Sequence, residues 1–296
     1  MQVYVITTLN KQIEIKITMA NITASEVNKL RQMTGAGMMD CKNALVESEG
    51  DFEKAIDTLR KKGQKLALKR ADRDANQGFV VAKTTEDKKF ASVIMLNCET
   101  DFVAKNQEFI DYANKIIDLT ITAKPASLEA LLALTIDGST VADGVTNLTG
   151  KTGEKMQLSH YDFVEAPLTY AYNHFGNRLA AILGLNKADV AGNEDLAKHV
   201  AMQIAAMNPV ALDKDGVDAE TIAREIEVGK DQAREEGKAE EMLEKIAMGK
   251  LNKFYKENTL LNQEFINDSK VTIREYLQKA DKDLTVTAFR RLQLGA

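Results

Sequence analysis

The sequence predicts an α+β protein whose sheets are antiparallel. Two observations support this fold class: segments with helical periodicity alternate with apolar runs typical of strands, and their order lacks the regular strand–helix–strand repeat of a parallel sheet. The 296-residue chain is 44% apolar and 28% charged, which is typical of globular proteins. Its length exceeds that of one typical domain, so we expect two or three folding units.

The first 18 residues are interpreted as an extension that precedes the conventional part of the chain. Their apolar residues alternate in two short stretches, at positions 3–6 and 13–17, as they do in strands. The segment lacks the features of a signal peptide, and its two lysines without an arginine disfavour a transit peptide. We expect Met19 to be the natural start, and an extra hairpin at 1–18 is the alternative.

Residues 19–74 are expected to form three short helices followed by a basic linker. Thr23 and Glu26 have the spacing of a capping box at the start of the first helix. A glycine-containing turn separates this helix from a second one at about 38–48, and Asp51 caps the third.

The segment from Arg60 to Arg73 contains seven lysine or arginine residues. Such a run is usually a solvated helix face or a linker, and a patch for RNA or an acidic partner is the alternative. The net charge of the whole chain is −5, which disfavours a large nucleic-acid footprint. Direct RNA binding is therefore not expected.

Two α+β subdomains are expected to follow, at residues 75–165 and 166–296. A helix is predicted at 107–122 from its apolar periodicity. Residues 124–159 contain several glycines and a proline and are interpreted as a loose helical excursion. Strands are predicted from apolar runs at 78–84, 90–97, 161–165, 168–173 and 179–185.

The remainder of the second subdomain is predicted to be mostly helical. A helix rich in alanine and methionine spans about 194–207 and ends before a proline. Residues 218–256 are dense in charge of both signs and carry a thin apolar stripe, which predicts a protruding helical hairpin. A dimer contact or a simple spacer is the alternative role for this hairpin. A helix near 271–280 and a strand near 284–294 complete the expected order.

The most informative segment is Thr100–Asn106, which follows the apolar run at 91–98. A buried strand should end in a polar turn, but here Phe102 stands beside Asp101 just before a helix. An isolated phenylalanine is usually a core residue. The alternative is an aromatic side chain held out on a rigid strand end to enter a pocket of a partner. The residue pattern alone leaves both interpretations open.

The chemistry of a conventional enzyme is not visible in this sequence. Cys41 and Cys98 are far apart and form no metal-binding pair, and a reducing compartment fits them best. The three histidines have no metal-ligand spacing, and the glycines at 35–37 are not followed by the lysine of a phosphate-binding loop. We expect no cofactor and no metal. No apolar run reaches the length that spans a membrane.

Two long motifs carry a resemblance to a known family. One is Thr34–Leu45, with the sequence TGAGMMDCKNAL, and the other is Cys98–Asn106, with the sequence CETDFVAKN. With these motifs the chain resembles bacterial elongation factor Ts, the nucleotide exchange factor of elongation factor Tu, over roughly residues 19–294. The resemblance implies a ubiquitin-associated-like fold for the three-helix start, a core of two α+β subdomains, and a protruding antiparallel helical pair at 218–256.

The resemblance also implies a function without covalent chemistry: the release of GDP from elongation factor Tu in the cytoplasm. In relatives, the loop that matches Thr100, Asp101, Phe102 and Val103 enters the nucleotide domain of elongation factor Tu and disturbs its Mg²⁺ site. The factor would bind both the GDP-bound and the nucleotide-free partner, and the nucleotide-free form more tightly.

Further contacts with elongation factor Tu are implied at Met38, Met39 and His174. Methionine suits such a surface because its side chain is flexible and polarisable, but at least one of the two methionines is expected in the core of the helical bundle. The turn after His174 departs from the glycine-rich pattern of the family, because Phe175 follows the histidine directly.

Rival functions remain open at this point. An RNA- or ribosome-associated module would use residues 60–73, and an enzyme would depend on Cys98. The position of Cys98 at the end of a buried strand favours inert packing over a nucleophilic role. A homodimer through the helical hairpin also stays open.

Overall fold

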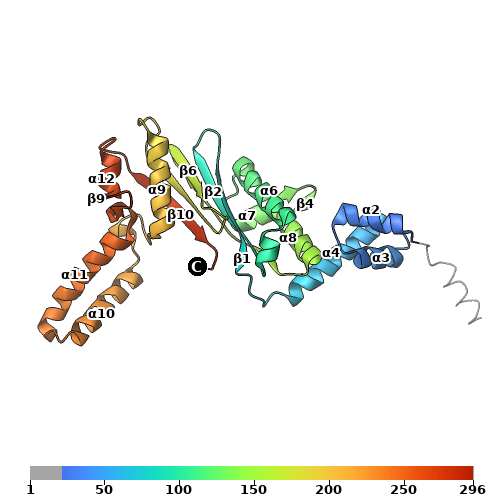
Figure 1. Ribbon diagram of the computed structural model, residues 1–296, viewed down its shortest axis with the longest axis horizontal. Coiled ribbons are helices and arrows are strands. Elements are labelled where there is room, and N and C mark those ends of the chain that lie inside the picture. The colour runs from blue at the N-terminus through green and yellow to red at the C-terminus, as the bar shows by residue number, and fades with distance from the viewer. Residues whose placement is uncertain (1–21, 296) are drawn as a thin grey trace, which may run out of the picture. The chain divides into compact units, whose positions relative to one another are not determined.

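The structure, a computed structural model, describes residues 22–295, so the predicted extension and Met19 lie outside the described residues (Figure 1). The chain separates into two compact units. We call residues 22–78, 97–109 and 132–157 the helical unit, and residues 79–96, 110–131 and 158–295 the sheet unit. Helices and antiparallel strand pairs both occur, which confirms the α+β class. The predicted domain boundaries at 74 and 165 stay a prediction.

The three helices predicted at the start of the helical unit are present: α2 (Ala24–Thr34), α3 (Met38–Glu47) and α4 (Phe52–Lys69). Thr23 and Glu26 form the predicted capping box of α2, and the Asp51 carboxylate accepts backbone N–H groups in the first turn of α4. These helices enclose a small core of Val27, Leu30, Cys41, Ala44, Leu45 and Ala55.

The basic segment that was predicted as a helix face or linker lies mostly on α4, which is longer than the sequence suggested. Lys62 pairs with Asp40, and Arg70 and Arg73 both pair with Glu99. Ion pairs within the helical unit therefore occupy part of the basic segment. This leaves a smaller free basic face for an RNA or acidic partner.

Residues 124–159 form helices, as the expected helical excursion implies, but these helices are packed and are not loose. They form α7 (Leu128–Ala133), a short hairpin of β3 (Thr135–Ile136) and β4 (Ser139–Thr140), α8 (Val141–Thr152) and the start of β5 (Met156–Glu165). The expected helical character is therefore present, and only the expected looseness was wrong. Gly150 instead allows α8 to pack closely on α4: a Cβ on Gly150 would lie 3.2 Å from Cα of Gly63. Figure 1 shows these two helices side by side.

Two three-stranded sheets form the framework of the sheet unit. One has the order β1 (Gln77–Thr84), β2 (Phe90–Cys98), β5, and its β5 begins earlier than predicted. The other has the order β10 (Val286–Gln293), β7 (Leu179–Leu185), β6 (Leu168–Asn173), with antiparallel pairs on both sides of β7. Every residue of β2 is buried, as expected of a strand at the centre of a sheet that is covered on both faces.

The central strand β7 connects two hydrophobic cores because successive side chains point to opposite faces. Ile182 lies in a cluster with apolar residues of β1 and β2. Leu183 lies in a second cluster with the helix α9 (Asn193–Met207), which covers the outer face of this sheet (Figure 1). Both side chains are fully buried, so β7 contributes to the packing on both faces of its sheet.

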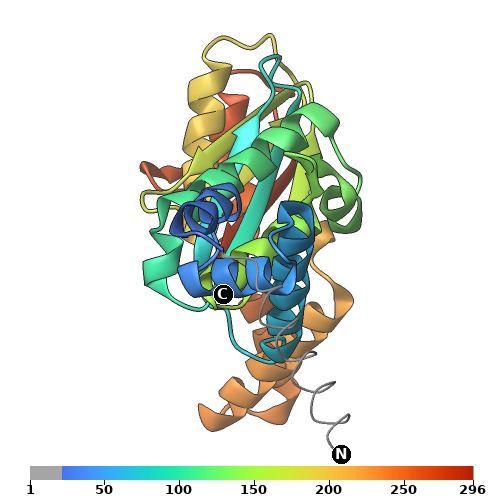
Figure 2. The same ribbon diagram turned by 90° about the vertical axis from the view of Figure 1, so that its right-hand side faces the viewer.

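The helical hairpin predicted at 218–256 is present as α10 (Ala219–Glu235) and α11 (Glu240–Asn258). Figure 2 shows the two helices, in orange, side by side. Gly229 lets them approach, because a Cβ there would lie 3.1 Å from Cα of Ala247. Ion pairs such as Lys230–Glu244 and Arg234–Glu240 join the two helices.

The C-terminal part differs from the prediction in one respect. The last helix, α12 (Ile273–Gln278), is shorter than the predicted 271–280 because a hairpin of β8 (Glu264–Phe265) and β9 (Asp268–Thr272) precedes it. These strands are too short to show a periodic pattern in the sequence. The final strand, β10, lies where a strand was predicted.

Candidate functional site

Phe102, the aromatic residue that could enter a pocket of a partner as a wedge, lies on α5 (Asp101–Ala104). This element is a single helical turn at the end of β2, where a turn without helix was expected. The Phe102 side chain is 82% exposed, so the alternative that it belongs to the core is wrong. Asp101 is exposed beside it and pairs with Lys105 at 2.7 Å. The hydrogen bond from Lys105 lowers the pKa of Asp101, which keeps this carboxylate charged.

The other two predicted residues of this segment, Thr100 and Val103, are half-buried. Thr100 is the N-cap of α5, and its hydroxyl accepts a hydrogen bond from the N–H of Val103 at 3.4 Å. The hydroxyl and the N–H of Thr100 also donate to the Glu154 carboxylate, at 2.7 and 3.1 Å. Asp101 and Phe102 are thus exposed to a partner, whereas Thr100 and Val103 pack partly within the chain.

Glu99 fixes the strand end that leads into α5. Its carboxylate accepts hydrogen bonds from Arg70 at 2.7 Å, from Arg73 at 3.1 Å and from the backbone N–H of Lys155 at 2.6 Å. The Glu99 side chain is only 14% exposed. Burial alone would raise its pKa, but the hydrogen bonds from Lys155, Arg70 and Arg73 outweigh burial and lower the pKa to about 2. The carboxylate therefore ties the end of α4 to the segment that joins β2 to α5.

We expect the contribution of Glu99 to stability to vanish in acid. The pKa of Glu99 falls from 4.5 to about 2 on folding, so its ionised form stabilises the fold above pH 4.5 and this stabilisation is lost as the pH falls towards 2. The variant Glu99→Gln should reduce the free energy of unfolding at pH 7 by on the order of 2–3 kcal/mol, and the difference from wild type should shrink through this pH window. Urea denaturation at several pH values measures it.

The control for this experiment is Glu86→Gln, which changes an exposed carboxylate in the turn between β1 and β2. It should leave the free energy of unfolding unchanged at pH 7. A Glu99→Gln deficit that stays constant from pH 7 to pH 2 would show that the Glu99 charge is not the cause.

Cys98 does not have the environment of a reactive thiol. Its Sγ donates a hydrogen bond to the carbonyl oxygen of Thr100 at 3.1 Å, and the residue is buried. Burial, together with the negative charge of Glu154, raises the pKa of the thiol to about 12. The thiol therefore stays protonated at neutral pH, which disfavours a nucleophilic role.

The two methionines of the first motif lie at the start of α3, and both are exposed. Met38 is 56% exposed and Met39 is 63% exposed, so the expectation that at least one lies in the bundle core is wrong. The core position in this turn of α3 is taken by Cys41 instead. Met33 at the end of α2 is also exposed, although it lies outside the two sequence motifs. Three thioether side chains are thus available on one end of the bundle.

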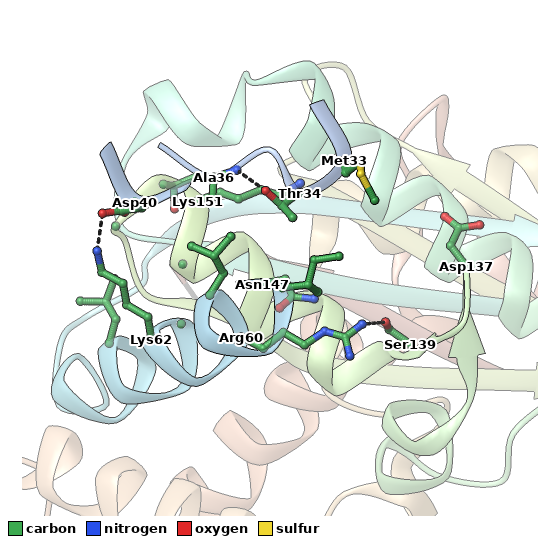
Figure 3. Close-up of a pocket in the computed structure, with 17 residues that line it drawn as sticks. Met33, Thr34, Ala36, Asp40, Arg60, Lys62, Asp137, Ser139, Asn147 and Lys151 are labelled. Atoms are coloured by element: carbon green, nitrogen blue, oxygen red, sulfur yellow. Dashed lines mark hydrogen bonds and ion pairs between the residues drawn. The ribbon is translucent and has the colours of Figure 1, made fainter. Parts of the chain in front are cut away.

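A cleft of about 610 Å³ lies in the helical unit between the first three helices and α8. Figure 3 shows the polar side chains that line it, among them the Lys62–Asp40 pair and Arg60, which donates to Ser139 at 3.4 Å. Lys151 at its rim pairs with Glu108. These side chains are paired with neighbouring side chains and do not form a nucleophile, base and acceptor arrangement.

His174 lies in the sheet unit, in the turn between β6 and β7, and it is exposed. Its Nδ1 shares a hydrogen bond with the Tyr172 hydroxyl at 2.9 Å. The side chain of Asn173 binds the backbone of Ala82 in β1, accepting its N–H at 2.7 Å and donating to its carbonyl at 2.9 Å. This rigid turn also presents Phe175, which is 97% exposed and is a second aromatic candidate for partner contact.

The structure places the predicted site residues on two units. Met38, Met39 and the α5 segment belong to the helical unit, and His174 belongs to the sheet unit. Among residues 22–295, no group of three His, Cys, Asp or Glu side chains is placed to hold a metal ion. In the same part of the chain, no helix is long and apolar enough to cross a membrane.

These features define a class of protein. Exposed aromatic and thioether side chains on short elements held by hydrogen bonds are typical of a protein that binds another protein through its surface.

Comparison with known proteins identifies the family. Residues 99–296 match the family model described as Elongation factor TS. Elongation factor Ts of Christiangramia forsetii is 52% identical over 277 residues, which cover 94% of this chain and 100% of the relative. The Porphyromonas gingivalis protein of the same name is 49% identical over 276 residues, or 93% of this chain and 99% of the relative. The chain belongs to the elongation factor Ts family of translation elongation factors.

Proposed function

We propose that this chain is a guanine nucleotide exchange factor that acts in the cytoplasm on elongation factor Tu. It binds the GDP-bound partner, disturbs the Mg²⁺ site and releases GDP so that GTP can bind. The observation that supports this most strongly is Phe102, 82% exposed on a helical turn whose N-cap is held by Glu154. A large apolar side chain in such a position gains most by entering a pocket of a partner.

The proposed mechanism is a difference in affinity. The chain binds nucleotide-free elongation factor Tu more tightly than the GDP-bound form, and linkage then requires that it weakens GDP binding by the same factor. No bond is made or broken in this process. Asp101 contributes because its carboxylate is charged and is presented next to Phe102, so it adds negative charge near a site that holds phosphates.

The energy needed exceeds what one side chain supplies. An acceleration of a few powers of ten requires about 4–6 kcal/mol, at about 1.4 kcal/mol per decade. Burial of one phenylalanine supplies roughly 1.5–3 kcal/mol. Further contacts must therefore contribute, and we assign them to Met38 and Met39 on α3 and to His174 on the β6–β7 turn, all of which are exposed.

The direct test is the release of a fluorescent GDP analogue from purified elongation factor Tu. We expect the wild-type chain to accelerate release at micromolar concentrations in the presence of excess GTP and Mg²⁺. Release at the intrinsic rate of elongation factor Tu, at any concentration of the chain, would refute the proposed function.

Met39→Ala should weaken binding to elongation factor Tu about 10-fold, because truncation removes most of the apolar area that this side chain would bury. It should leave the unfolding midpoint unchanged, because Met39 is already exposed in the free protein. Isothermal titration with nucleotide-free partner measures the affinity. Leu68→Ala is the matched control: Leu68 is 79% exposed on α4, and its truncation should change neither quantity. Unchanged affinity in Met39→Ala would remove this residue from the contact.

A further inference from the structure

The helical turn α5 cannot be stable by itself. It contains four residues, and none of them is buried. Forming a first helical turn fixes several backbone angles in exchange for one hydrogen bond, so isolated helices of this length are not populated. Packing of its own side chains contributes little, because Phe102 points into solvent and Val103 is only half-buried. Its conformation therefore depends largely on its N-terminal cap.

Two other helices of this chain, α2 and α12, begin with a complete capping box. In α2, the N–H and the hydroxyl of Thr23 both donate to Glu26 at 2.8 Å. In α12, the N–H and the hydroxyl of Thr272 donate to Glu275 at 2.7 and 3.1 Å. In both, the glutamate lies three residues after the threonine, which is the spacing of a capping box.

In α5 the residue at this position is Val103, which has no acceptor in its side chain. Glu154, which lies 54 residues after Thr100, supplies the carboxylate instead. It accepts the Thr100 N–H at 3.1 Å and the Thr100 hydroxyl at 2.7 Å, while the N–H of Val103 donates to the Thr100 hydroxyl oxygen at 3.4 Å. The hydrogen bonds are those of a capping box, but the glutamate comes from the segment that follows α8.

The two segments hold each other reciprocally. While Glu154 accepts the backbone N–H of Thr100, Glu99 accepts the backbone N–H of Lys155 at 2.6 Å. Gly153 ends α8 with a φ of 77°, a left-handed conformation that strongly favours glycine, and this turn directs Glu154 towards α5. The Lys155 ammonium group also donates to the carbonyl oxygens of Ala71 and Arg73, at 2.7 and 2.9 Å.

We propose that Glu154 is a positioning residue for nucleotide exchange: it completes the cap of α5 from a distance and so fixes the direction in which Phe102 is presented. The inference rests on the proposed function. Because the carboxylate comes from outside the turn, the first turn of α5 keeps an apolar residue at Val103 and leaves Asp101 and Phe102 free to face a partner. Thr100 then acts through this cap, since its hydroxyl and N–H are already engaged with Glu154.

The test compares Glu154→Ala with wild type in two measurements. The concentration dependence of fluorescent GDP release should show a maximal rate lowered about 10-fold, as expected for loss of a cap on a one-turn helix. The half-saturating concentration should stay within about 3-fold of wild type, because the contacts at Met38, Met39 and His174 are untouched. Amide hydrogen exchange should increase in a peptide that covers residues 100–106 and stay unchanged in peptides from the sheet unit.

Two further variants keep the test decisive. Glu154→Gln retains one carbonyl acceptor and should recover part of the maximal rate, which also covers the case in which Glu154→Ala folds poorly. Glu275→Ala removes a carboxylate of the same geometry from the capping box of α12, far along the chain. In this variant, residues 272–278 should lose protection from amide hydrogen exchange. The release of GDP from elongation factor Tu should proceed at the rate seen with the wild-type chain.

The inference is overturned if Glu154→Ala keeps the wild-type maximal rate, or if residues 100–106 keep their protection from exchange in this variant. These outcomes differ from a failure of the proposed function. In that case the wild-type chain itself would not accelerate GDP release, and the hydrogen-exchange comparison would still show whether Glu154 caps α5.

Discussion

Phe102→Ala should slow the release of GDP from elongation factor Tu by about 10- to 100-fold relative to the wild-type chain. This range follows from the roughly 1.5–3 kcal/mol that burial of a phenylalanine supplies, at about 1.4 kcal/mol per decade. The variant should fold normally, because the ring is 82% exposed and contributes little packing in the free protein. Stopped-flow fluorescence of a labelled GDP measures the rate, and thermal unfolding checks the fold.

The matched control for this variant is Leu68→Ala, which removes an apolar side chain of similar exposure from α4. It should release GDP at the wild-type rate. If Phe102→Ala also did so, Phe102 would not be the wedge. A lowered melting temperature in Phe102→Ala would instead mean that the ring packs within its own chain, contrary to its exposure in the structure.

Leu183→Ala should strongly lower the free energy of unfolding. The side chain is fully buried in the cluster between the β10–β7–β6 sheet and α9. The truncation loses the burial energy of the deleted atoms and leaves a cavity. The cavity persists because β7 is paired with a strand on each side and cannot shift to fill it. Together these two effects should lower the free energy of unfolding by about 3 kcal/mol. Urea denaturation followed by circular dichroism measures the loss.

Val228→Ala on α10 provides the comparison, because its side chain is 42% exposed. It should change the free energy of unfolding by less than about 0.5 kcal/mol. A cost for Leu183→Ala below about 1 kcal/mol would mean that the site collapses around the smaller side chain, and that β7 is packed less tightly than its burial indicates.

The regular elements of this fold could be predicted because their periodicity is strong. The strands β6 and β7 lie at the predicted residues, and the capping box of Thr23 and Glu26 starts α2 as expected. Residues 124–159 could not be interpreted in the same way. Gly150 breaks a helical pattern in the sequence, but in the fold it is the point of contact between α8 and α4, and only the partner helix reveals this.

The residues of the candidate site could be proposed from the sequence, but whether their side chains are exposed or buried could not. The sequence left Phe102 as either core or wedge and placed at least one methionine of the first motif in the core. Whether a methionine of α3 is exposed depends on which residue of that helix fills the core of the three-helix bundle. Cys41 takes this position. Phe102, Met38 and Met39 are all exposed, so exposure is what the structure adds to the motifs.

The residues that brace the site were missed altogether. Glu99 is part of the second motif, but its bonds to Arg70 and Arg73 join positions 29 and 26 residues apart. Glu154 lies in the segment interpreted as loose and reaches Thr100 across 54 residues. Neither contact has a sequence periodicity. The absence of a glutamate at Val103, three residues after an N-cap threonine, is the one signal that could have indicated a cap from elsewhere.

The central claim is that this chain releases GDP because it binds nucleotide-free elongation factor Tu more tightly than the GDP-bound form. The most direct measurement is the dissociation constant of the wild-type chain for elongation factor Tu, once in nucleotide-free buffer with EDTA and once with saturating GDP and Mg²⁺. Differential affinity predicts that the nucleotide-free partner binds about 1,000-fold more tightly, a difference of about 4 kcal/mol. Equal dissociation constants in the two conditions would contradict the account, because a ligand without such a preference cannot displace GDP.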